Sequence, residues 1–345
     1  MGVFYTIPAT EDFAETFIHY IDDLAVQKNL PLSKIKIYVP TRRSIRALKE
    51  AFLRGSNGQP RILPIIQAIG DSDAEEMSFL TPHAPDILPA MDGTQRQIIL
   101  ARLLEKAWQG TYNFTNALAI AGDLGRLIDQ IHTENIPFSQ LDKVVELQEF
   151  SEHCDITLSF LKLLLQDLWP TYLEETGKID TGLHRRLKIE ALTHFYKDNP
   201  PKHPVMIAGS TGSHPATRRL IQTIGMGDHG YIFLPALDQM MDDQTWLSVT
   251  DGHPQYLLKR LIDHCKIKRQ DIIEYSKNEV DENRLFTLSE IMRPADKTDA
   301  WQGLVDPLSQ NKITAAIENM SLCMCDNEEH EARSIALSMA EIAAD

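Results

Sequence analysis

Short apolar runs alternate with amphipathic segments over the first 90 residues. Apolar runs of strand length lie at residues 3–8 (VFYTIP), 34–40 (KIKIYVP) and 61–70 (RILPIIQAIG). Between the first two runs, Phe13, Phe17, Ile21 and Leu24 recur at the spacing of one helical face. Strands that alternate with helices in this way predict a parallel sheet with right-handed crossovers.

The pattern changes between residues 94 and 198, where four successive stretches are helical and none reads as a strand. Strands are again predicted at 204–209 and 230–238, and a last one at 320–326 precedes a helical pattern. We therefore expect an α/β fold whose parallel sheet is interrupted by a large all-helical insertion. The predicted division assigns the two parts of the α/β domain to residues 1–92 and 203–310, the insertion to 93–202 and the start of a second domain to 311–345.

The composition is that of a globular protein, with 345 residues, 24% of them charged, and a net charge of −15. No apolar run approaches the roughly 18 residues of a membrane span, and the N-terminus lacks the basic region of a signal peptide. We therefore expect a cytoplasmic protein with no membrane partner. The last helical pattern stops without Gly, Asn or Pro, which favours a chain truncated within its second domain.

The cysteines and histidines do not form a recognisable chemical motif. Cys154, Cys265, Cys323 and Cys325 are too scattered for a disulfide framework or a paired CxxC metal site. Because Cys323 and Cys325 alternate within the strand predicted at 320–326, we expect structural, at least half-buried thiols. The twelve histidines show no HExxH-like spacing. We therefore assign no catalytic residue and no metal site.

One segment is strongly basic although the whole chain is acidic. From residue 34 to residue 61 the sequence holds eight lysines and arginines and a single acid, Glu50. The helix predicted after the second strand would present cations, a hydroxyl and free backbone amides at the carboxyl edge of the sheet. These groups suit a phosphodiester backbone, although a solvated basic helix is the alternative. The predicted DNA-binding residues are Thr41, Arg42, Arg43, Arg46 and Lys49.

The first strand–loop–helix is where a nucleotide-binding α/β domain would carry its phosphate loop. Such a loop needs glycines and a lysine, and residues 7–13 (IPATEDF) contain neither. Glu11 and Asp12 open the following helix, where they would repel a triphosphate, and Thr10 is expected to cap it. Pro8, Thr10 and Glu11 thus occupy a degenerate nucleotide loop, and ATP binding is not expected.

A second loop, residues 209–213 (GSTGS), also lies between a strand and a helix. Its amides could face an anion, but the sequence is not GxxxxGK[ST], and Pro215 at the helix start makes Ser213 or His214 a cap. The pattern favours a tight turn over a phosphate contact for Gly209, Ser210 and Thr211. No acid ends this strand, so the carboxylate that would hold a catalytic Mg²⁺ is missing.

Two other classes of function stay open. The acidic stretch 71–76 (DSDAEE), or Asp238 after the strand at 230–238, could ligate a divalent metal for a phosphoesterase or nuclease, although a solvated loop is the simpler interpretation. In a third hypothesis the basic helix docks an acidic protein, and the chain is a scaffold without enzymatic activity.

Several blocks together resemble the N-terminal part of the AddB family in its alphaproteobacterial form. In chain order they are IYVPTRRSIRALKEAFL, ILPIIQAIGDSDAEE, VMIAGSTGSHPATRRLI, FLPALDQMMDDQTW, HPQYLLKRLI, MRPADKTDAW and EEHEARSIALSMAEI. The resemblance implies a helicase-like core of the RecA-like, P-loop NTPase type, related to the UvrD/RecB superfamily. It also implies the partner AddA, which supplies the ATP-driven motor of a helicase–nuclease that resects broken DNA ends for homologous recombination.

The same resemblance implies roles for particular residues. Thr41, Arg42 and Arg43 fall where the superfamily contacts single-stranded DNA, while residues 7–12 and 208–213 fall where its Walker A and Walker B motifs would lie. Both motifs are degenerate here, so this chain is not expected to be catalytic alone. The family's nuclease domain, with Mg²⁺ and a cysteine-ligated iron–sulfur cluster, has no match in these residues, and no cofactor is expected in them.

Overall fold

The computed structural model describes residues 2–56, 59–70, 87–107, 113–140, 161–318 and 320–344. The chain forms two compact units. Unit 1 comprises Met1–Gln239 and Val249–Glu279, and unit 2 comprises Met240–Ser248 and Val280–Asp345. The predicted boundaries at residues 92, 202 and 310 describe a different, finer division and stay a prediction.

Unit 1 is built on a six-stranded sheet in which every pair of neighbouring strands is parallel. The strands are β1 (Val3–Ile7), β2 (Lys36–Val39), β3 (Ile65–Ala68), β4 (Val205–Ala208), β5 (Gly230–Pro235) and β6 (Ile273–Glu274). Their order in the sheet is β3-β2-β4-β5-β1-β6. The α/β class and the parallel sheet predicted from the alternating pattern are therefore confirmed.

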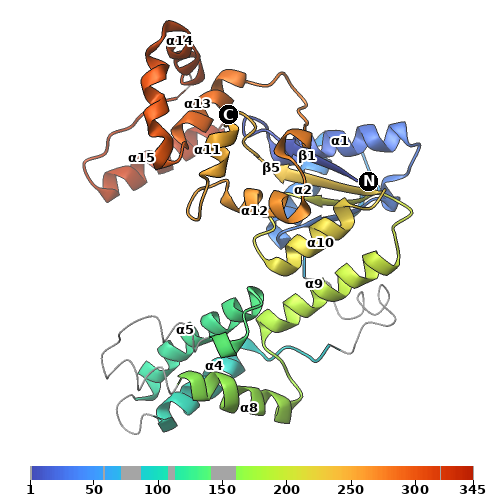
Figure 1. Ribbon diagram of the computed structural model, residues 1–345, viewed down its shortest axis with the longest axis vertical. Helices are drawn as coiled ribbons and strands as arrows, with labels where there is room; N and C mark the ends of the chain where they lie inside the picture. Colours follow the sequence, from blue (N-terminus) through green and yellow to red (C-terminus); the bar gives the residue numbers. More distant parts are fainter. Residues whose placement is uncertain are drawn as a thin grey trace. The chain divides into compact units, whose positions relative to one another are not determined.

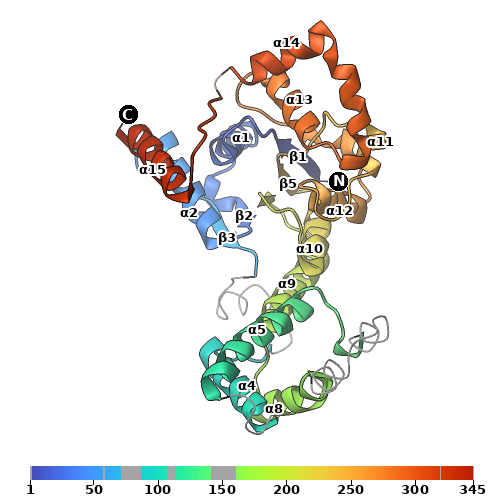
Figure 2. The same ribbon diagram turned by 90° about the vertical axis from the view of Figure 1, so that its left-hand side faces the viewer.

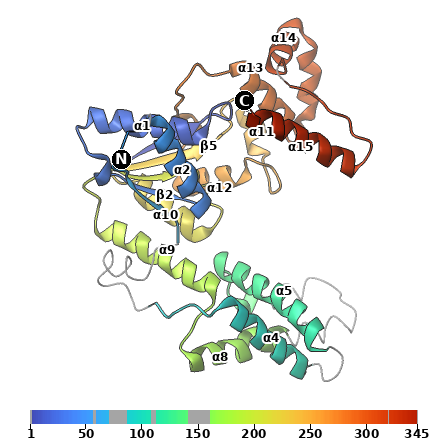
Figure 3. The same cartoon turned by 180° about the vertical axis from the view of Figure 1, so that it is seen from behind.

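Helices cover both faces of this sheet. Figure 3 shows α1 (Phe13–Gln27) and α2 (Arg42–Gly55) beside the sheet. On this face they bury Phe17, Ile21 and Phe52 in a core shared with Ile37 and Phe233. This core has the 3.6-residue periodicity seen in the sequence of α1. Figure 1 shows α1 and α10 (Pro215–Gly225) on opposite sides of the sheet.

The second face is covered closely by α10, which packs on α12 (Tyr256–Cys265). Gly225 of α10 lies over Phe4 and Ile232, and a Cβ added there would come within 2.7 Å of two carbons of the Phe4 ring. Phe4 and Ile232 are adjacent along their strands to Tyr5 and Phe233, which face the α1 side, as the two-residue period of a strand requires. The sheet is therefore the middle of three layers.

The described residues between 93 and 198 are mainly helical, as the sequence predicts. The helices are α4 (Gly93–Ala107), α5 (Phe114–Thr133), a π-helical turn η3 (Leu164–Leu168), α8 (Trp169–Thr176) and α9 (Thr181–Asp198). Leu100, Leu104, Ile128 and Trp169 form a separate apolar core between α4, α5 and α8. The chain leading into α4 lies beside the chain that joins α8 to α9, because the Met91 amide donates to the Ile179 carbonyl at 2.8 Å. Figure 2 shows α9 running from this group toward α10.

Unit 2 is helical. Its helices are α11 (Asp243–Leu247), α13 (Glu282–Ile291), the 3₁₀ segment η5 (Ala295–Val305), α14 (Pro307–Ala316) and α15 (Glu328–Ala344). Unit 1 also contains the short 3₁₀ turns η1 (Leu32–Lys34), η2 (Phe138–Gln140) and η4 (Arg269–Asp271). The strand predicted at 320–326 is wrong: residues 320–325 are extended without a strand partner, and Leu322 and Met324 are exposed. Their alternation is real, but in the structure no neighbouring strand pairs with it.

No helix in the described part of the chain combines the length and the apolar composition that a bilayer span needs.

Arg293 joins the two stretches of sequence that form unit 2. Its guanidinium donates to Asp242 Oδ2 at 3.2 Å and Thr245 Oγ1 at 2.7 Å, and it also pairs with Glu290 through Nε at 2.8 Å. Asp242 is the N-cap of α11 and accepts hydrogen bonds from the Thr245 hydroxyl and amide. These two bonds, with Arg293, lower the pKa of Asp242 to about 2.

This lowered pKa predicts how Asp242 contributes to stability as the pH changes. The folded-state pKa lies below the ordinary value, so the contribution is present above about pH 4 and is lost as the pH falls toward 2. We expect the Asp242 carboxyl resonance to titrate with a midpoint near 2 in the folded protein. In Thr245→Val, which removes the hydroxyl donor, the midpoint should rise toward 3.8. Equal midpoints in the two proteins would contradict this assignment.

Candidate functional site

The neighbouring strands β2 and β4 send their helices to opposite faces of the sheet. After β2 the chain continues into α2 on the face of α1, and after β4 it continues into α10 on the other face. Open α/β sheets bind ligands outside the carboxyl ends of strands at such a divergence. The predicted DNA-binding residues and the GSTGS loop both lie at this carboxyl edge.

The first turn of α2 presents cations where the helix dipole is positive. Thr41 is the N-cap, and its hydroxyl accepts a hydrogen bond from the Ser44 amide at 3.1 Å. The Ser44 amide, one of the backbone amides predicted to be free, therefore already donates a hydrogen bond within the helix cap. Arg42 and Arg43 follow and are exposed. Positive side chains in the first turn of a helix are unfavourable for its stability, so this placement needs another reason.

In the folded chain, acids outside residues 34–61 pair with some of the cations of this basic segment. Arg54 Nε lies 3.2 Å from Glu15 Oε1, and Arg61 pairs with Asp22. Both acids are on α1, which precedes the basic segment. Arg46 pairs with Glu50 one turn along α2 at 2.8 Å, with 83% of the Arg46 side chain exposed. Such an exposed pair contributes little to stability, so Arg46 can still turn to another anion.

Arg43 and Lys49 complete the predicted set, and both are exposed on α2. The structure thus places Thr41, Arg42, Arg43, Arg46 and Lys49 on one helix that begins at the carboxyl end of β2. The end of α2 toward Arg54 is neutralised by α1, so the positive charge is concentrated toward the edge of the sheet.

The GSTGS loop is a tight turn held from within the protein. Arg218 is 6% exposed, and its Nη1 donates to the carbonyls of Gly212 and Ser213, both at 2.9 Å. Gly209 and Gly212 have φ of +72° and +60°, and a Cβ on Gly212 would lie 2.9 Å from Leu261. Burial, followed by the charges of Arg260 and Arg219 among other neighbours, lowers the pKa of Arg218.

The helix after this loop begins at His214, the N-cap of α10, with Pro215 in its first turn. Ser210 is buried, and its hydroxyl accepts from the Gly212 amide at 3.3 Å. The polar groups of the loop therefore bind each other and Arg218, which favours the interpretation as a structural turn.

A carboxylate of the protein itself occupies the first loop. Glu11 accepts hydrogen bonds from Ser276 Oγ at 2.7 Å, Thr16 Oγ1 at 2.9 Å and Asn278 Nδ2 at 3.1 Å. Burial alone would raise the pKa of Glu11, but these donors lower it, so the group stays ionised. A bound triphosphate would face this fixed negative charge.

The predicted cap of α1 is wrong in detail. Asp12, rather than Thr10, is the N-cap, and its side chain accepts from the Glu15 amide at 2.8 Å. The Thr10 hydroxyl is instead buried without a hydrogen-bond partner. The error arises because both residue types cap helices well, and the sequence does not show which one has the extended backbone that a cap requires.

A cation on α9 lies at the same edge of the sheet and was not predicted. Ile69 continues the pairing of β3 with β2, because its amide donates to the Val39 carbonyl at 2.8 Å. Gly70 follows with φ of +81°, and a Cβ there would lie 2.9 Å from Cγ of Arg185. Arg185 is exposed. Gly70, which Arg185 contacts, follows the last residue paired with β2 and lies about one strand spacing, roughly 5 Å, from the chain that leads into Thr41.

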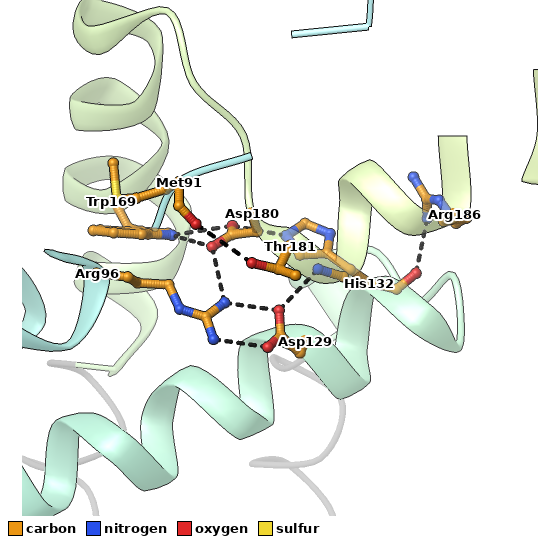
Figure 4. A network of polar contacts seen from close by, with 9 residues as sticks. Met91, Arg96, Asp129, His132, Trp169, Asp180, Thr181 and Arg186 are labelled. Atoms are coloured by element: carbon orange, nitrogen blue, oxygen red, sulfur yellow. Dashed lines mark hydrogen bonds and ion pairs between the residues drawn. The ribbon is translucent and has the colours of Figure 1, made fainter. Parts of the chain in front are cut away.

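A buried polar network anchors the beginning of α9 (Figure 4). Asp180 is 1% exposed and its Oδ2 accepts from Trp169 Nε1 at 3.1 Å, and His132 Nε2 lies 3.1 Å from the same oxygen. Arg96 reaches Asp180 at 3.5 Å and forms two hydrogen bonds of 2.7 Å with Asp129.

Asp129 completes the network by accepting from the Gly182 amide in the first turn of α9 at 2.9 Å. The hydrogen bonds that Asp129 accepts lower its pKa in spite of burial. The hydrogen bonds that Arg96 donates to Asp129 raise the pKa of Arg96. Because the Asp129 and Asp180 carboxylates accept hydrogen bonds from Arg96, Trp169 and the Gly182 amide, the network reads as a structural anchor. Arg96 and Asp180 are 84 residues apart in the chain, so no local motif could have revealed the network.

The alternative metal site cannot be examined at Asp71, Asp73, Glu75 and Glu76, which lie outside the described residues. Elsewhere, the described ranges hold no group of three or more His, Cys, Asp or Glu side chains arranged to bind a metal ion.

The buried network predicts a large difference between two aspartates of the helical part. In Asp180→Ala, the indole of Trp169 and the Arg96 charge lose a buried acceptor, which we expect to cost about 3–5 kcal/mol of unfolding free energy. Asp123→Ala removes an exposed partner of Arg126 on α5 and should cost less than about 1 kcal/mol. Urea unfolding measures both. Similar losses in the two variants would contradict the buried role of Asp180.

Comparison with known proteins does not assign this chain to a family. No protein-family model matches it, and no curated protein is similar enough to count as a relative. The resemblance to the AddB family therefore stands on the sequence blocks quoted above, and the function is argued from the geometry of the carboxyl edge.

Proposed function

We propose that this chain is a non-hydrolysing, helicase-like module of the AddB type that binds DNA at the carboxyl edge of its sheet. Its ligand would be a single strand or the end of a duplex, held by phosphate contacts from α2. In this proposal the chain also docks on AddA, and the ATP-driven motor lies in that partner. The nuclease, with its Mg²⁺ and iron–sulfur cluster, belongs to sequence that these residues do not match.

The observation that carries the proposal is the contrast between the loops that follow β1 and β2, two strands that β4 and β5 separate in the sheet. Glu11 keeps a hydrogen-bonded negative charge in the first loop, where a nucleotide would place its phosphates. The second strand ends instead at exposed Arg42 and Arg43, next to the positive end of α2. The edge of the sheet therefore disfavours a nucleotide at one position and favours a polyanion at the other.

The order of the strands supports the helicase-like reading of the fold. The strands followed by the two degenerate motifs, β1 and β4, are separated only by β5, and their carboxyl ends lie at one edge. A motor with intact motifs needs both at a single nucleotide. The helices between β3 and β4 correspond to the proposed insertion, in which the chain before α4 pairs with the chain before α9 at Met91 and Ile179.

The acidic character of the chain also shapes the proposal. With a net charge of −15, most of the surface repels DNA, so binding would be confined to the cationic edge. Local contacts of this kind position a strand without reading its sequence.

The proposal is tested by the salt dependence of binding to a fluorescent oligonucleotide. Each phosphate contact to a single strand contributes about 0.7 to the slope of log K against log salt concentration. Arg42→Ala with Arg43→Ala should therefore lower the slope by about 1.4. The matched control is Arg54→Ala with Arg61→Ala, which removes the same charge from residues paired with α1 and should leave the slope unchanged.

Three outcomes would contradict this assignment. One is equal binding by the protein and the Arg42/Arg43 variant, and another is an equal loss in the control. The third is saturable binding of MgATP to the chain, which would raise its melting temperature as ligand concentration increases. Binding to AddA without any DNA affinity would favour the scaffold hypothesis instead.

The same assay tests the contribution of α9. Because Arg185 lies beside the end of β3, Arg185→Ala should lower the salt slope by about 0.7. Lys197→Ala, in the last turn of the same helix, serves as its control and should not change the slope. A larger effect of Lys197 than of Arg185 would place the DNA elsewhere.

A further inference from the structure

Two thiols lie in contact on the connection between α14 and α15. The Sγ atoms of Cys323 and Cys325 are 3.7 Å apart, Cys323 is exposed and Cys325 is half-buried. Residues 320–325 have no regular secondary structure, and the two cysteines are two positions apart in the chain. The contact thus follows from the local backbone, and the predicted burial of both thiols is wrong at Cys323.

Cys265 shows what an inert thiol looks like in the same protein. It is 2% exposed in the layer of α12, and burial raises its pKa to about 12. Since the thiolate is the reactive form, Cys265 is neither accessible nor ionised at neutral pH. Cys154 lies outside the described residues.

We propose that Cys323 and Cys325 form a redox-active dithiol that undergoes exchange with a small disulfide such as oxidised glutathione. The Cys323 thiolate attacks one sulfur of the oxidised glutathione, forms a mixed disulfide and releases one glutathione thiolate. Cys325 then loses its proton and attacks Cys323, which forms the Cys323–Cys325 bond and releases the second glutathione. The protein loses two electrons and two protons, and one oxidised glutathione becomes two reduced molecules.

The surroundings assign the order of the two steps. Cys325 Sγ contacts Ser334 Oγ at 3.7 Å, and Ser334 donates to the His330 carbonyl at 2.9 Å. The Ser334 contact alone would lower the pKa of Cys325, but desolvation, Cys323 and Glu331 together raise it. Cys323 is more exposed and therefore acts first, while Cys325 is held beside it to resolve the mixed disulfide.

The bond would constrain the connection that leads into α15. A ring closed between residues 323 and 325 limits the backbone dihedrals of Met324, which is 83% exposed and otherwise free of regular structure. Small strained disulfides in exposed segments are reduced more readily than buried structural ones. The pair is therefore suited to reversible oxidation.

Peptide mapping of the full chain tests the proposal. After incubation with oxidised glutathione and blocking of remaining thiols, trypsin cleavage after Lys312 and Arg333 releases one peptide that holds both cysteines and no other. We expect this peptide to lose two hydrogen atoms and to escape blocking, at a rate independent of protein concentration. Dithiothreitol should reverse the change, and Cys265 should be blocked only after denaturation.

Single variants separate the two roles. Cys325→Ser should accumulate glutathione on Cys323 because the resolving thiol is missing, while Cys323→Ser should react more slowly. The proposal is overturned if the peptide stays a dithiol, if glutathione remains on both cysteines of the unaltered chain, or if Cys265 reacts at the same rate. None of these readouts depends on DNA binding, so they are independent of the function proposed above.

Discussion

The carboxylate of Glu11 sets the chemistry of the whole carboxyl edge. Three donors, from α1 and from the segment at residues 276–278, keep it ionised in the loop after β1. A parallel sheet brings the ends of all its strands to one edge, so a negative charge after one strand affects what can bind beside the others. In the sheet, β5 separates this loop from the β2–β4 position, where the cations of α2 begin.

The cationic position depends on the packing of α1 against α2 as much as on its own residues. Glu15 and Asp22 of α1 neutralise Arg54 and Arg61, which leaves positive charge toward Arg42 and Arg43. A count along the sequence treats all these cations as equal, because the acids that pair with them belong to the preceding helix. The segment is therefore polarised, with one neutral end against α1 and one cationic end at the sheet.

Sequence periodicity predicted the sheet well because a buried parallel strand and an amphipathic helix each leave a regular pattern. The prediction failed where a strand-like alternation has no neighbouring strand to pair with. Met320, Leu322 and Met324 alternate as a strand would, but no strand pairs with them and they are exposed. The Asp180 network is the opposite case, since its members are invisible in sequence and become a unit only when α4, α5, α8 and α9 are packed.

The placement of Arg185 follows from that packing. Asp129 and Asp180 hold the first turn of α9, while Arg219 binds Glu190 at 2.6 Å and the hydroxyls of Tyr38 and Tyr196 meet at 3.0 Å further along. A helix fixed at both ends by polar contacts cannot slide or rotate without leaving buried groups unsatisfied. Arg185 is thus held beside Gly70 by contacts on either side of it along α9.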